Sequence, residues 1–193
     1  MKKVIFASNN RNKVREVKHI LNDLDIYLIS LADMPEEIEI VEDGKTFEEN
    51  ALIKAKIVSD KFNIPAIADD SGLMVEQLNG EPGIYSARFA GENATDEENN
   101  NKLLNKLKEL PEPHKAKFVC AAVYYDGQVS FTARGEFQGK IIHHARGSNG
   151  FGYDPLFLPD GYSITLAEMD AAQKNKISHR YNAFKELKKI LMQ

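Results

Sequence analysis

Cysteine is almost absent from this sequence, and so are long hydrophobic runs. Cys120 is the only cysteine in the 193 residues, which excludes an intrachain disulfide and a cysteine-based zinc site and fits a reducing compartment. The N-terminal apolar run covers only residues 4–7, which is too short for the core of a signal peptide. No segment approaches the length of a transmembrane helix. We therefore expect a cytoplasmic protein with no membrane partner.

An excess of positive charge is also missing. The formal net charge is -4, which argues against a general nucleic-acid binder but leaves room for a local basic pocket that binds a small anion. The composition is 42% hydrophobic and 28% charged, so a chain of this length can bury a substantial core. We expect one domain spanning residues 1–193.

Two common nucleotide-binding motifs are absent. The P-loop pattern G-x-x-x-x-G-K-[ST] occurs nowhere, and the glycines at 147, 150 and 152 do not match the G-x-G-x-x-G spacing of a Rossmann dinucleotide site. Internal repeats, low-complexity segments and linker-like composition shifts are absent as well. A nucleotide site in this chain must therefore be built in another way.

Strand-like and helix-like patterns alternate along the chain, which predicts an α/β fold with a mixed sheet. Thr46 and Thr95 each precede a glutamate by three residues, the capping-box pattern of a helix start. The dipeptide Asp126-Gly127 lies between two strand-like runs and favours a hairpin. The order of the strands does not follow from the sequence. The predicted strands are 3–7, 26–31, 66–70, 117–125 and 128–137, and the predicted helices begin near Lys13, Thr46, Thr95 and Ser178.

Two adjacent carboxylates, Asp69 and Asp70, end the apolar run that begins at Ala66. Successive side chains of a strand point to opposite faces, so the pair cannot act as one acid/base dyad. A buried carboxylate needs a cation, a metal or hydrogen-bond donors to offset its lost hydration. Mg²⁺ needs few protein ligands because it keeps waters and takes substrate phosphates, and Glu42 is a candidate for the second ligand beside one aspartate.

The segment ASNNRNK, residues 7–13, joins the first predicted strand to the first predicted helix. Backbone N-H groups at a helix N-terminus suit phosphate oxygens, and Lys13 adds a positive charge. The alternative, in which Asn and Ser only cap the helix, stays open on these residues alone. In TFEENALIKA, Asn50 and Lys54 are four residues apart and share one helix face, which is equally compatible with an ordinary solvated face.

Two further polar clusters lie towards the C-terminus. The segment GSNGFGYDPLF, residues 147–157, combines glycines with a ring for stacking, Phe151, and an acceptor, Asp154. The segment KNKISHRYN places Lys174, His179 and Arg180 at the start of the last helix, where cations are disfavoured unless an anionic or carbonyl-rich ligand is near. An aromatic-anchored turn and a structural histidine are the open alternatives. Taken together, the clusters predict a nucleoside triphosphate site.

Six strings of this sequence resemble, in order, the motifs of the Ham1/inosine triphosphatase family. They are SNNRNKVREV, TFEENALIKA, AIADDSGL, PGIYSARFAG, GFGYDPLF and KNKISHR, and the resemblance runs from residue 4 to about residue 190. It implies a Mg²⁺-dependent enzyme that cleaves dITP, ITP, XTP and dXTP to the nucleoside monophosphate and pyrophosphate. Such an enzyme would cleanse the nucleotide pool of deaminated purines.

The resemblance also implies roles for individual residues. Asp70 would be the catalytic base and, with Glu42, a metal ligand, whereas Asp69 would support it. Phe151 to Asp154, Lys174, His179 and Arg180 would hold the nucleoside, and selectivity for a 6-oxo purine is expected if Arg180, His179 or nearby backbone N-H groups face its 6-oxygen. The implied substrate-binding residues are Ser8, Asn9, Asn10, Arg11, Asn12, Lys13, Lys54, Ser71, Phe151, Gly152, Tyr153, Asp154, Lys174, His179 and Arg180.

The fold that the resemblance implies is an elongated mixed β-sheet flanked by helices, with two lobes around a central cleft, and family members are usually homodimers. Three other functions fit the sequence less well. The arginine-rich N-terminal signature of Maf-type nucleotide pyrophosphatases is absent from this sequence. A haloacid-dehalogenase-type phosphatase needs aspartates two residues apart, whereas Asp69 and Asp70 are adjacent. A nucleotide sensor without activity would not need a competent residue at each predicted catalytic position, and this sequence has one at each.

Overall fold

A six-stranded sheet brings together strands from distant parts of the chain. The computed structural model describes residues 1–192. The strand order is β2-β1-β3-β4-β5-β6; β1 pairs in parallel with β2 and β3, and β5 pairs antiparallel with β6, so the sheet is mixed as predicted. The elements are β1 (Lys2–Phe6), α1 (Arg11–Ile20), β2 (Ile26–Ser30), η1 (Leu31–Asp33), α2 (Phe47–Phe62), β3 (Ala66–Val75), η2 (Glu76–Leu78), η3 (Gly83–Arg88), α3 (Asp96–Leu107), β4 (His114–Tyr125), β5 (Ser130–Ile141), β6 (Phe157–Pro159), α4 (Ala171–Lys174) and α5 (His179–Leu191).

The chain forms two units that share three of the strands. Unit 1 comprises residues 1–70, 120–135 and 180–192, and unit 2 comprises Ser71–Val119 and Glu136–His179. β3, β4 and β5 each contribute residues to both units, so the chain passes between them more than once. The expectations of one domain over residues 1–193 and of a cleft between two lobes stay predictions.

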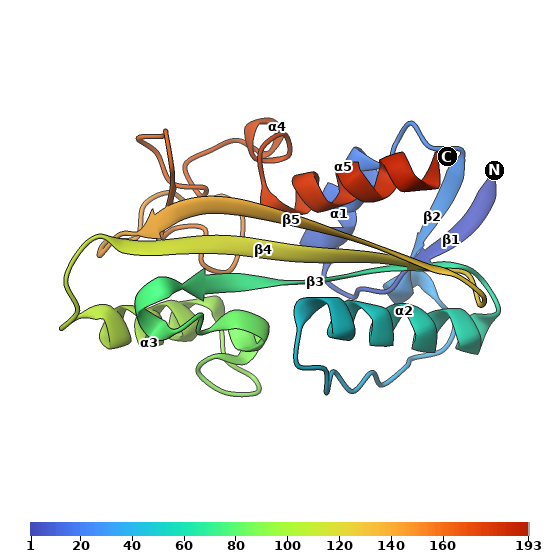
Figure 1. Cartoon of the computed structure of the whole chain (residues 1–193), viewed down its shortest axis with the longest axis horizontal. Helices are drawn as coiled ribbons and strands as arrows, with labels where there is room; N and C mark the ends of the chain where they lie inside the picture. The colour runs from blue at the N-terminus through green and yellow to red at the C-terminus, as the bar shows by residue number, and fades with distance from the viewer. Residues whose placement is uncertain (193) are drawn as a thin grey trace. The chain divides into compact units, whose positions relative to one another are not determined.

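In unit 1, helices cover both faces of the strands. Figure 1 shows α2 on one side of the strands and α1 and α5 on the other. Val4 and Phe6 of β1 and Ile67 of β3 pack with Val17 of α1 and Phe184 of α5 in one buried cluster. The alternating residues of the same strands face the other way, towards α2. This two-sided burial explains why these short strands are almost continuously apolar.

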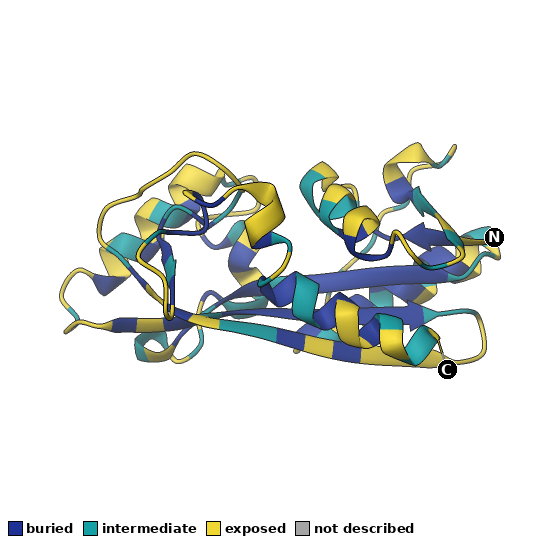
Figure 2. Ribbon diagram, turned by 90° about the horizontal axis from the view of Figure 1, so that it is seen from above, coloured by how far each residue is buried: buried dark blue, intermediate teal, exposed yellow. Residues whose placement is uncertain are grey.

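In unit 2, α3 supplies much of the core. Its N-terminus carries a complete capping box, in which Thr95 and Glu98 bond reciprocally as the sequence predicts. Leu103 and Leu107 of α3 pack with Leu73 and Phe157 among other residues of one buried cluster. Figure 2 shows the buried residues concentrated along the strands and on the inward faces of the helices.

Several element boundaries differ from their predicted positions. α1 begins at Arg11, earlier than the predicted start near Lys13, because the side chain of Asn10 accepts hydrogen bonds from the N-H groups of Asn12 and Lys13 and caps the helix there. β4 and β5 are joined through residues 126–129, so their connection is longer than the two-residue turn expected from Asp126-Gly127.

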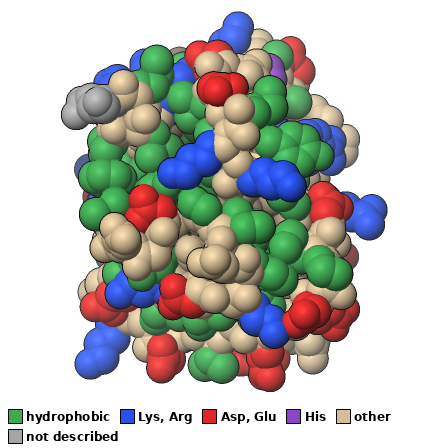
Figure 3. All heavy atoms as spheres, turned by 90° about the vertical axis from the view of Figure 1, so that its right-hand side faces the viewer, with side chains coloured by type: hydrophobic (Ala, Val, Ile, Leu, Met, Phe, Trp, Pro, Cys, Tyr) green, Lys and Arg blue, Asp and Glu red, His purple; other side chains and the backbone are tan. Residues whose placement is uncertain are grey.

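The helices of the described chain, residues 1–192, include none that is both long and apolar enough to cross a membrane. One end of unit 1 is seen in Figure 3, where Lys and Arg side chains are interspersed with Asp and Glu side chains and with hydrophobic ones.

Candidate functional site

The alternation of side chains along β3 sends Asp69 and Asp70 to opposite faces of the sheet. Ile67 packs in the cluster beneath α1 and α5, and Asp69, two residues further along β3, shares its face. Asp70 therefore faces α2. Both carboxylates are buried, with residue exposures of 1% for Asp69 and 7% for Asp70. The partners of the two differ because they come from different helices.

Asp69 lies among cations from α1 and α5. Its Oδ2 is 3.1 Å from Nζ of Lys13 and accepts a hydrogen bond of 3.2 Å from Nε of Arg180. NH1 of Arg180 bonds in turn to Oε2 of Glu16 on α1, at 2.6 Å. The thiol of Cys120 on the neighbouring strand β4 lies 3.9 Å from the same carboxylate. This arrangement is a buried network in which two cations face two anions.

Asp70 lies among residues of α2 and of the segment that precedes it. Its Oδ2 accepts a hydrogen bond from Nδ2 of Asn50 at 3.1 Å, and its Oδ1 is 3.6 Å from Nζ of Lys54. The same Nζ donates to Oε2 of Glu42 at 2.8 Å. Oδ1 of Asn50 accepts from the N-H of Gly44 at 2.9 Å, which ties the Glu42 segment to the start of α2. Asn50 and Lys54 share one helix face, as their spacing predicts.

The two environments shift the pKa values of the two aspartates in opposite directions. Burial alone would raise the pKa of Asp69, but Lys13 and Arg180 outweigh it and hold that pKa well below its usual range. Burial raises the pKa of Asp70, and the lowering effects of Lys54 and Lys13 do not cancel it. The charged form of Asp69 is thus favoured, whereas Asp70 is the better proton acceptor of the pair.

The loop between β1 and α1 is held by its own side chains. Oγ of Ser8 accepts from the N-H of Asn10 at 3.2 Å, and Oδ1 of Asn10 accepts from Asn12 and Lys13 at 3.0 and 3.2 Å. Arg11 is exposed on the first turn. The capping role left open by the sequence is therefore present, and phosphate binding by this loop stays a prediction.

In unit 2, the predicted nucleoside-binding residues 151, 154 and 174 lie together. Oδ2 of Asp154 accepts from Nζ of Lys174 at 2.7 Å and from the N-H of Phe151 at 2.9 Å. The Lys174 ammonium lies 4.8 Å from the centre of the Phe151 ring. Gly150 has a φ of +78°, and a Cβ there would overlap with Oδ2 of Asp154, so only glycine fits this turn.

Three other predicted residues have different surroundings. The ring of His179 stacks on Phe118 of β4, with centroids 4.7 Å apart and planes at 13°. Tyr153 is buried, and its hydroxyl donates to the carbonyl of Ser86 at 2.9 Å. Arg180, only 1% exposed, belongs to the Asp69 network of unit 1. A contact of Arg180 or His179 with the base stays a prediction.

Comparisons with known proteins decide the family. The Ham1 family matches residues 4–190. This chain belongs to the Ham1 family. The dITP/XTP pyrophosphatase of Oceanobacillus iheyensis is 46% identical, covering 99% of this chain and 98% of that protein. The dITP/XTP pyrophosphatase of Geobacter sulfurreducens is 47% identical, covering 97% of this chain and 96% of that protein.

Solved structures of Ham1 proteins share the fold of this family member. The HAM1 protein of Coxiella burnetii matches with a TM-score of 0.90 at 38% identity, covering 100% of this chain and 99% of that one. The Ham1 protein of Staphylococcus aureus matches with a TM-score of 0.89 at 42% identity, covering 99% of this chain and 98% of that one. The α/β fold predicted from the sequence, with a mixed sheet flanked by helices, is confirmed.

The two predicted metal ligands of this Ham1 protein, Glu42 and Asp70, both lie beside the ammonium group of Lys54. The ammonium of Lys54 lies within reach of carboxylate oxygens of both Glu42 and Asp70, so the two side chains are arranged to share a positive charge. Oxygen ligands of this kind suit Mg²⁺, which completes its coordination with waters and phosphates. Within residues 1–192, no group of three or more His, Cys, Asp or Glu side chains could hold a metal ion, so a metal would rest on this pair and on the substrate. The residues fit such an ion.

Sequence reasoning missed four residues that shape the clusters. Glu16 bonds to Arg180 in unit 1, and Phe118, Asp96 and Asn100 contact His179 and Gly152 in unit 2. All four act through contacts between segments distant in sequence, which no local pattern reveals. Asn50, which bonds to Asp70, had a local signal because it shares a helix face with Lys54.

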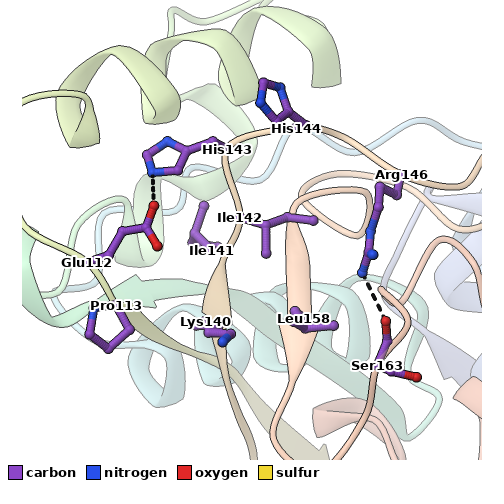
Figure 4. Close-up of a pocket in the computed structure, with 10 residues that line it drawn as sticks. All are labelled: Glu112, Pro113, Lys140, Ile141, Ile142, His143, His144, Arg146, Leu158 and Ser163. Atoms are coloured by element: carbon purple, nitrogen blue, oxygen red, sulfur yellow. Dashed lines mark hydrogen bonds and ion pairs between the residues drawn. The ribbon is translucent and has the colours of Figure 1, made fainter.

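A cavity of about 410 Å³ on unit 2 lies outside both clusters. Figure 4 shows its lining around the end of β5, with Arg146 bonded to the carbonyl of Ser163 and His143 bonded to Glu112. None of the site residues predicted from the sequence lines it.

Proposed function

We propose that this protein hydrolyses deaminated, non-standard purine nucleoside triphosphates (ITP, dITP, XTP and dXTP) to the nucleoside monophosphate and pyrophosphate. Full-length likeness to proteins named dITP/XTP pyrophosphatase supports the substrate class. The observation that carries the chemistry is the separation of the two aspartates, because it leaves Asp70 as a carboxylate of raised pKa beside a lysine and a second carboxylate.

The residues of unit 1 supply the chemistry on the triphosphate. Asp70 accepts a proton from the attacking water, whose oxygen bonds to phosphorus as the bond to the departing pyrophosphate breaks. Lys13 and Lys54 offset the negative charge that grows on the departing group. Asp69 keeps the ammonium of Lys13 in place, at 3.1 Å, and does not exchange protons itself. The loop Ser8 to Lys13 offers its remaining backbone donors to phosphate oxygens.

A Mg²⁺ ion belongs to this proposal. Glu42 and Asp70 would hold it, and the ion would neutralise phosphate charge. Lys54 bonds to both carboxylates, which keeps them oriented towards each other, and Asn50 fixes Asp70 from the side of α2.

The residues of unit 2 bind the nucleoside in this proposal. Phe151 stacks on the purine and Asp154 holds Lys174 and the Phe151 N-H in place. Hypoxanthine and xanthine carry an oxygen at position 6, where adenine carries an amino group. If donors such as His179 or backbone N-H groups face that position, adenine leaves each of them unsatisfied, at a cost of about 1–3 kcal/mol per group. Guanine shares the 6-oxygen, so we expect weaker discrimination against it.

We further propose that the protein works as a homodimer in the cytoplasm. The family resemblance supports the dimer, and a single free, buried cysteine is compatible with a reducing compartment. Light scattering coupled to size-exclusion chromatography measures the mass in solution, and a mass of one chain at micromolar concentration would contradict the dimer.

The reaction itself is tested by product analysis with ITP in the presence and absence of Mg²⁺. We expect inosine monophosphate and pyrophosphate in equal amounts, and loss of turnover when the metal is chelated, with recovery when Mg²⁺ is restored. Orthophosphate as the first product, or unchanged turnover in chelator, would refute the proposed reaction or its metal dependence, respectively.

A further inference from the structure

The backbone of Gly152 is held on both sides by the first turns of α3. Its N-H donates to Oδ2 of Asp96 at 2.6 Å, and its carbonyl accepts from Nδ2 of Asn100 at 3.1 Å. Asp96 and Asn100 are four residues apart and therefore lie on the same face of α3. Two side chains of one helix thus hold the two peptide groups that flank Gly152, and the first of these also contains the carbonyl of Phe151.

Asn100 donates to Gly152 through Nδ2, and this orientation leaves its amide oxygen, Oδ1, without a hydrogen bond among the described residues. Oδ1 of Asn100 is buried and, within residues 1–192, has no hydrogen-bond partner. Turning the amide round would bring Oδ1 to the Gly152 carbonyl, where two acceptors would face each other, so the bond to Gly152 sets the orientation. A buried acceptor without a partner lowers stability, and a residue that serves the core alone would gain nothing from it.

The rest of the loop is held by other contacts, and Gly152 is where it is hydrogen-bonded to side chains of α3. Phe151 and Asp154 are joined by the N-H to carboxylate bond, and the hydroxyl of Tyr153 bonds to the backbone of Ser86. Gly152 itself has a φ of +63° and no atom near the place of a Cβ, so its backbone has room to move. Without the two bonds from α3, the peptide between Phe151 and Gly152 keeps its contact with the Asp154 N-H at 3.4 Å but loses its tie to the helix.

We infer that Asp96 and Asn100 are positioning residues for nucleoside binding, which act by holding Gly152 so that the ring of Phe151 is ordered before the substrate arrives. This inference rests on the proposed function. We call Asp96 and Asn100 the clamp. A Phe151 ring that is already ordered in the free protein loses less conformational entropy on binding, so the clamp lowers the entropic cost of holding the purine. Loss of the clamp therefore weakens binding of the nucleoside and leaves the chemistry on the triphosphate almost unchanged.

The test compares Asp96→Ala and Asn100→Ala with two matched controls on the same helix. Glu97→Ala removes an exposed acidic residue from the same first turn, and Asn101→Ala removes an exposed asparagine next to Asn100. Asp96→Asn is the conservative variant, because its amide oxygen still accepts from the Gly152 N-H. For each protein, kcat and KM are measured with ITP, the inhibition constant is measured for inorganic triphosphate, which has no base, and urea unfolding gives stability.

We expect Asp96→Ala and Asn100→Ala to raise the KM for ITP about three- to tenfold each, the range for a lost hydrogen bond, with kcat changed by less than about twofold. The inhibition constant of inorganic triphosphate stays as in the wild type, Asp96→Asn recovers most of the lost affinity, and both controls keep the wild-type KM. Asn100→Ala also removes the partnerless acceptor, so its urea midpoint stays close to that of the wild type.

A KM for ITP that is the same in the clamp variants and the controls would overturn the inference, as would an equal weakening of inorganic triphosphate. A wild-type protein that does not hydrolyse ITP would instead overturn the proposed function, and the inference with it. The two failures are distinguished by the wild-type measurement alone.

Discussion

At the scale of residues, the adjacent aspartates are separated by the geometry of a strand. Asp69 and Asp70 follow each other in the chain, yet one is surrounded by α1 and α5 and the other by α2. The sequence predicts their opposite facing, because the alternation of side chains is a property of any strand. It does not predict which cation meets which carboxylate, because Lys13 and Arg180 come from helices at opposite ends of the chain.

The first prediction separates turnover from stability. We expect Asp70→Asn to abolish nearly all turnover with ITP while stability is kept or slightly raised, because burial already disfavours the charge of Asp70. Asp69→Asn leaves the buried Arg180 and the half-buried Lys13 with less compensating charge, so we expect it to lose about 3–5 kcal/mol of unfolding free energy. Turnover per folded molecule should fall less in Asp69→Asn than in Asp70→Asn. Steady-state kinetics and urea unfolding of both variants measure this, and the opposite order of turnover would show that the roles are exchanged.

The second prediction concerns Arg180. Since its guanidinium joins Glu16 to Asp69 inside unit 1, we expect Arg180→Ala to lower stability by about 3–5 kcal/mol and to reduce efficiency with ITP and with ATP by similar factors. Glu16→Gln, which keeps the shape but not the charge, should give the same pattern in weaker form. If Arg180 contacts the 6-oxygen of the base, as the sequence suggested, efficiency with ITP falls much more than with ATP. The ratio of the two kcat/KM values distinguishes these results.

At the scale of elements, capping residues and apolar spacing predicted most helices, because those signals are local. Thr95 with Glu98 forms the capping box seen in the sequence, and Asn10 ends up as the cap of α1. Contacts between a helix and a loop that is distant in the sequence could not be predicted. The bond from Asp96 to Gly152 spans residues far apart in the chain, and its formation depends on tertiary packing alone.

The third prediction tests the turn that carries Phe151. We expect Gly150→Ala to raise the KM for ITP at least about tenfold, because the new Cβ displaces the Asp154 carboxylate from Lys174 and from the Phe151 N-H. Gly161→Ala is the matched control, since Gly161 has a similar φ of +82° and open space at the Cβ position. Both variants should lose some stability from the strained φ, and Gly150→Ala should lose more because it also separates the buried Asp154–Lys174 pair. Equal KM values in the two would contradict the role of this turn.

At the scale of the whole molecule, stability also depends on groups that the proposed reaction does not use, such as His114. His114 of β4 is 1% exposed, its Nδ1 lies 2.7 Å from Oε1 of Gln77, and its ring meets that of His143 edge to face. Burial, together with the neighbouring His143, lowers the pKa of His114, against a smaller opposing effect of Glu112. The folded protein therefore holds this imidazole neutral at a pH at which the unfolded chain takes up a proton.

The fourth prediction follows from that difference in proton uptake. A histidine with a depressed pKa in the folded state contributes its full stability above the unfolded pKa of about 6.5, and loses it as the pH falls through that value towards the folded pKa. We expect the unfolding free energy of the wild type to fall more steeply between about pH 7 and pH 5 than that of His114→Gln. His144→Gln, at an exposed position, is the control and should follow the wild type. Identical slopes for wild type and His114→Gln would contradict this assignment.

The measurement that tests the central claim most directly is pyrophosphate release from ITP, XTP, GTP, ATP and dTTP, side by side in Mg²⁺ with one preparation of the full chain. If this Ham1 protein removes deaminated purines, kcat/KM for ITP and XTP exceeds that for ATP by about a hundredfold or more, which corresponds to one or two buried donors left unsatisfied by adenine. GTP should lie between them, and dTTP should be a poor substrate. Equal efficiency across the five nucleotides, or a preference for dTTP, would contradict the account.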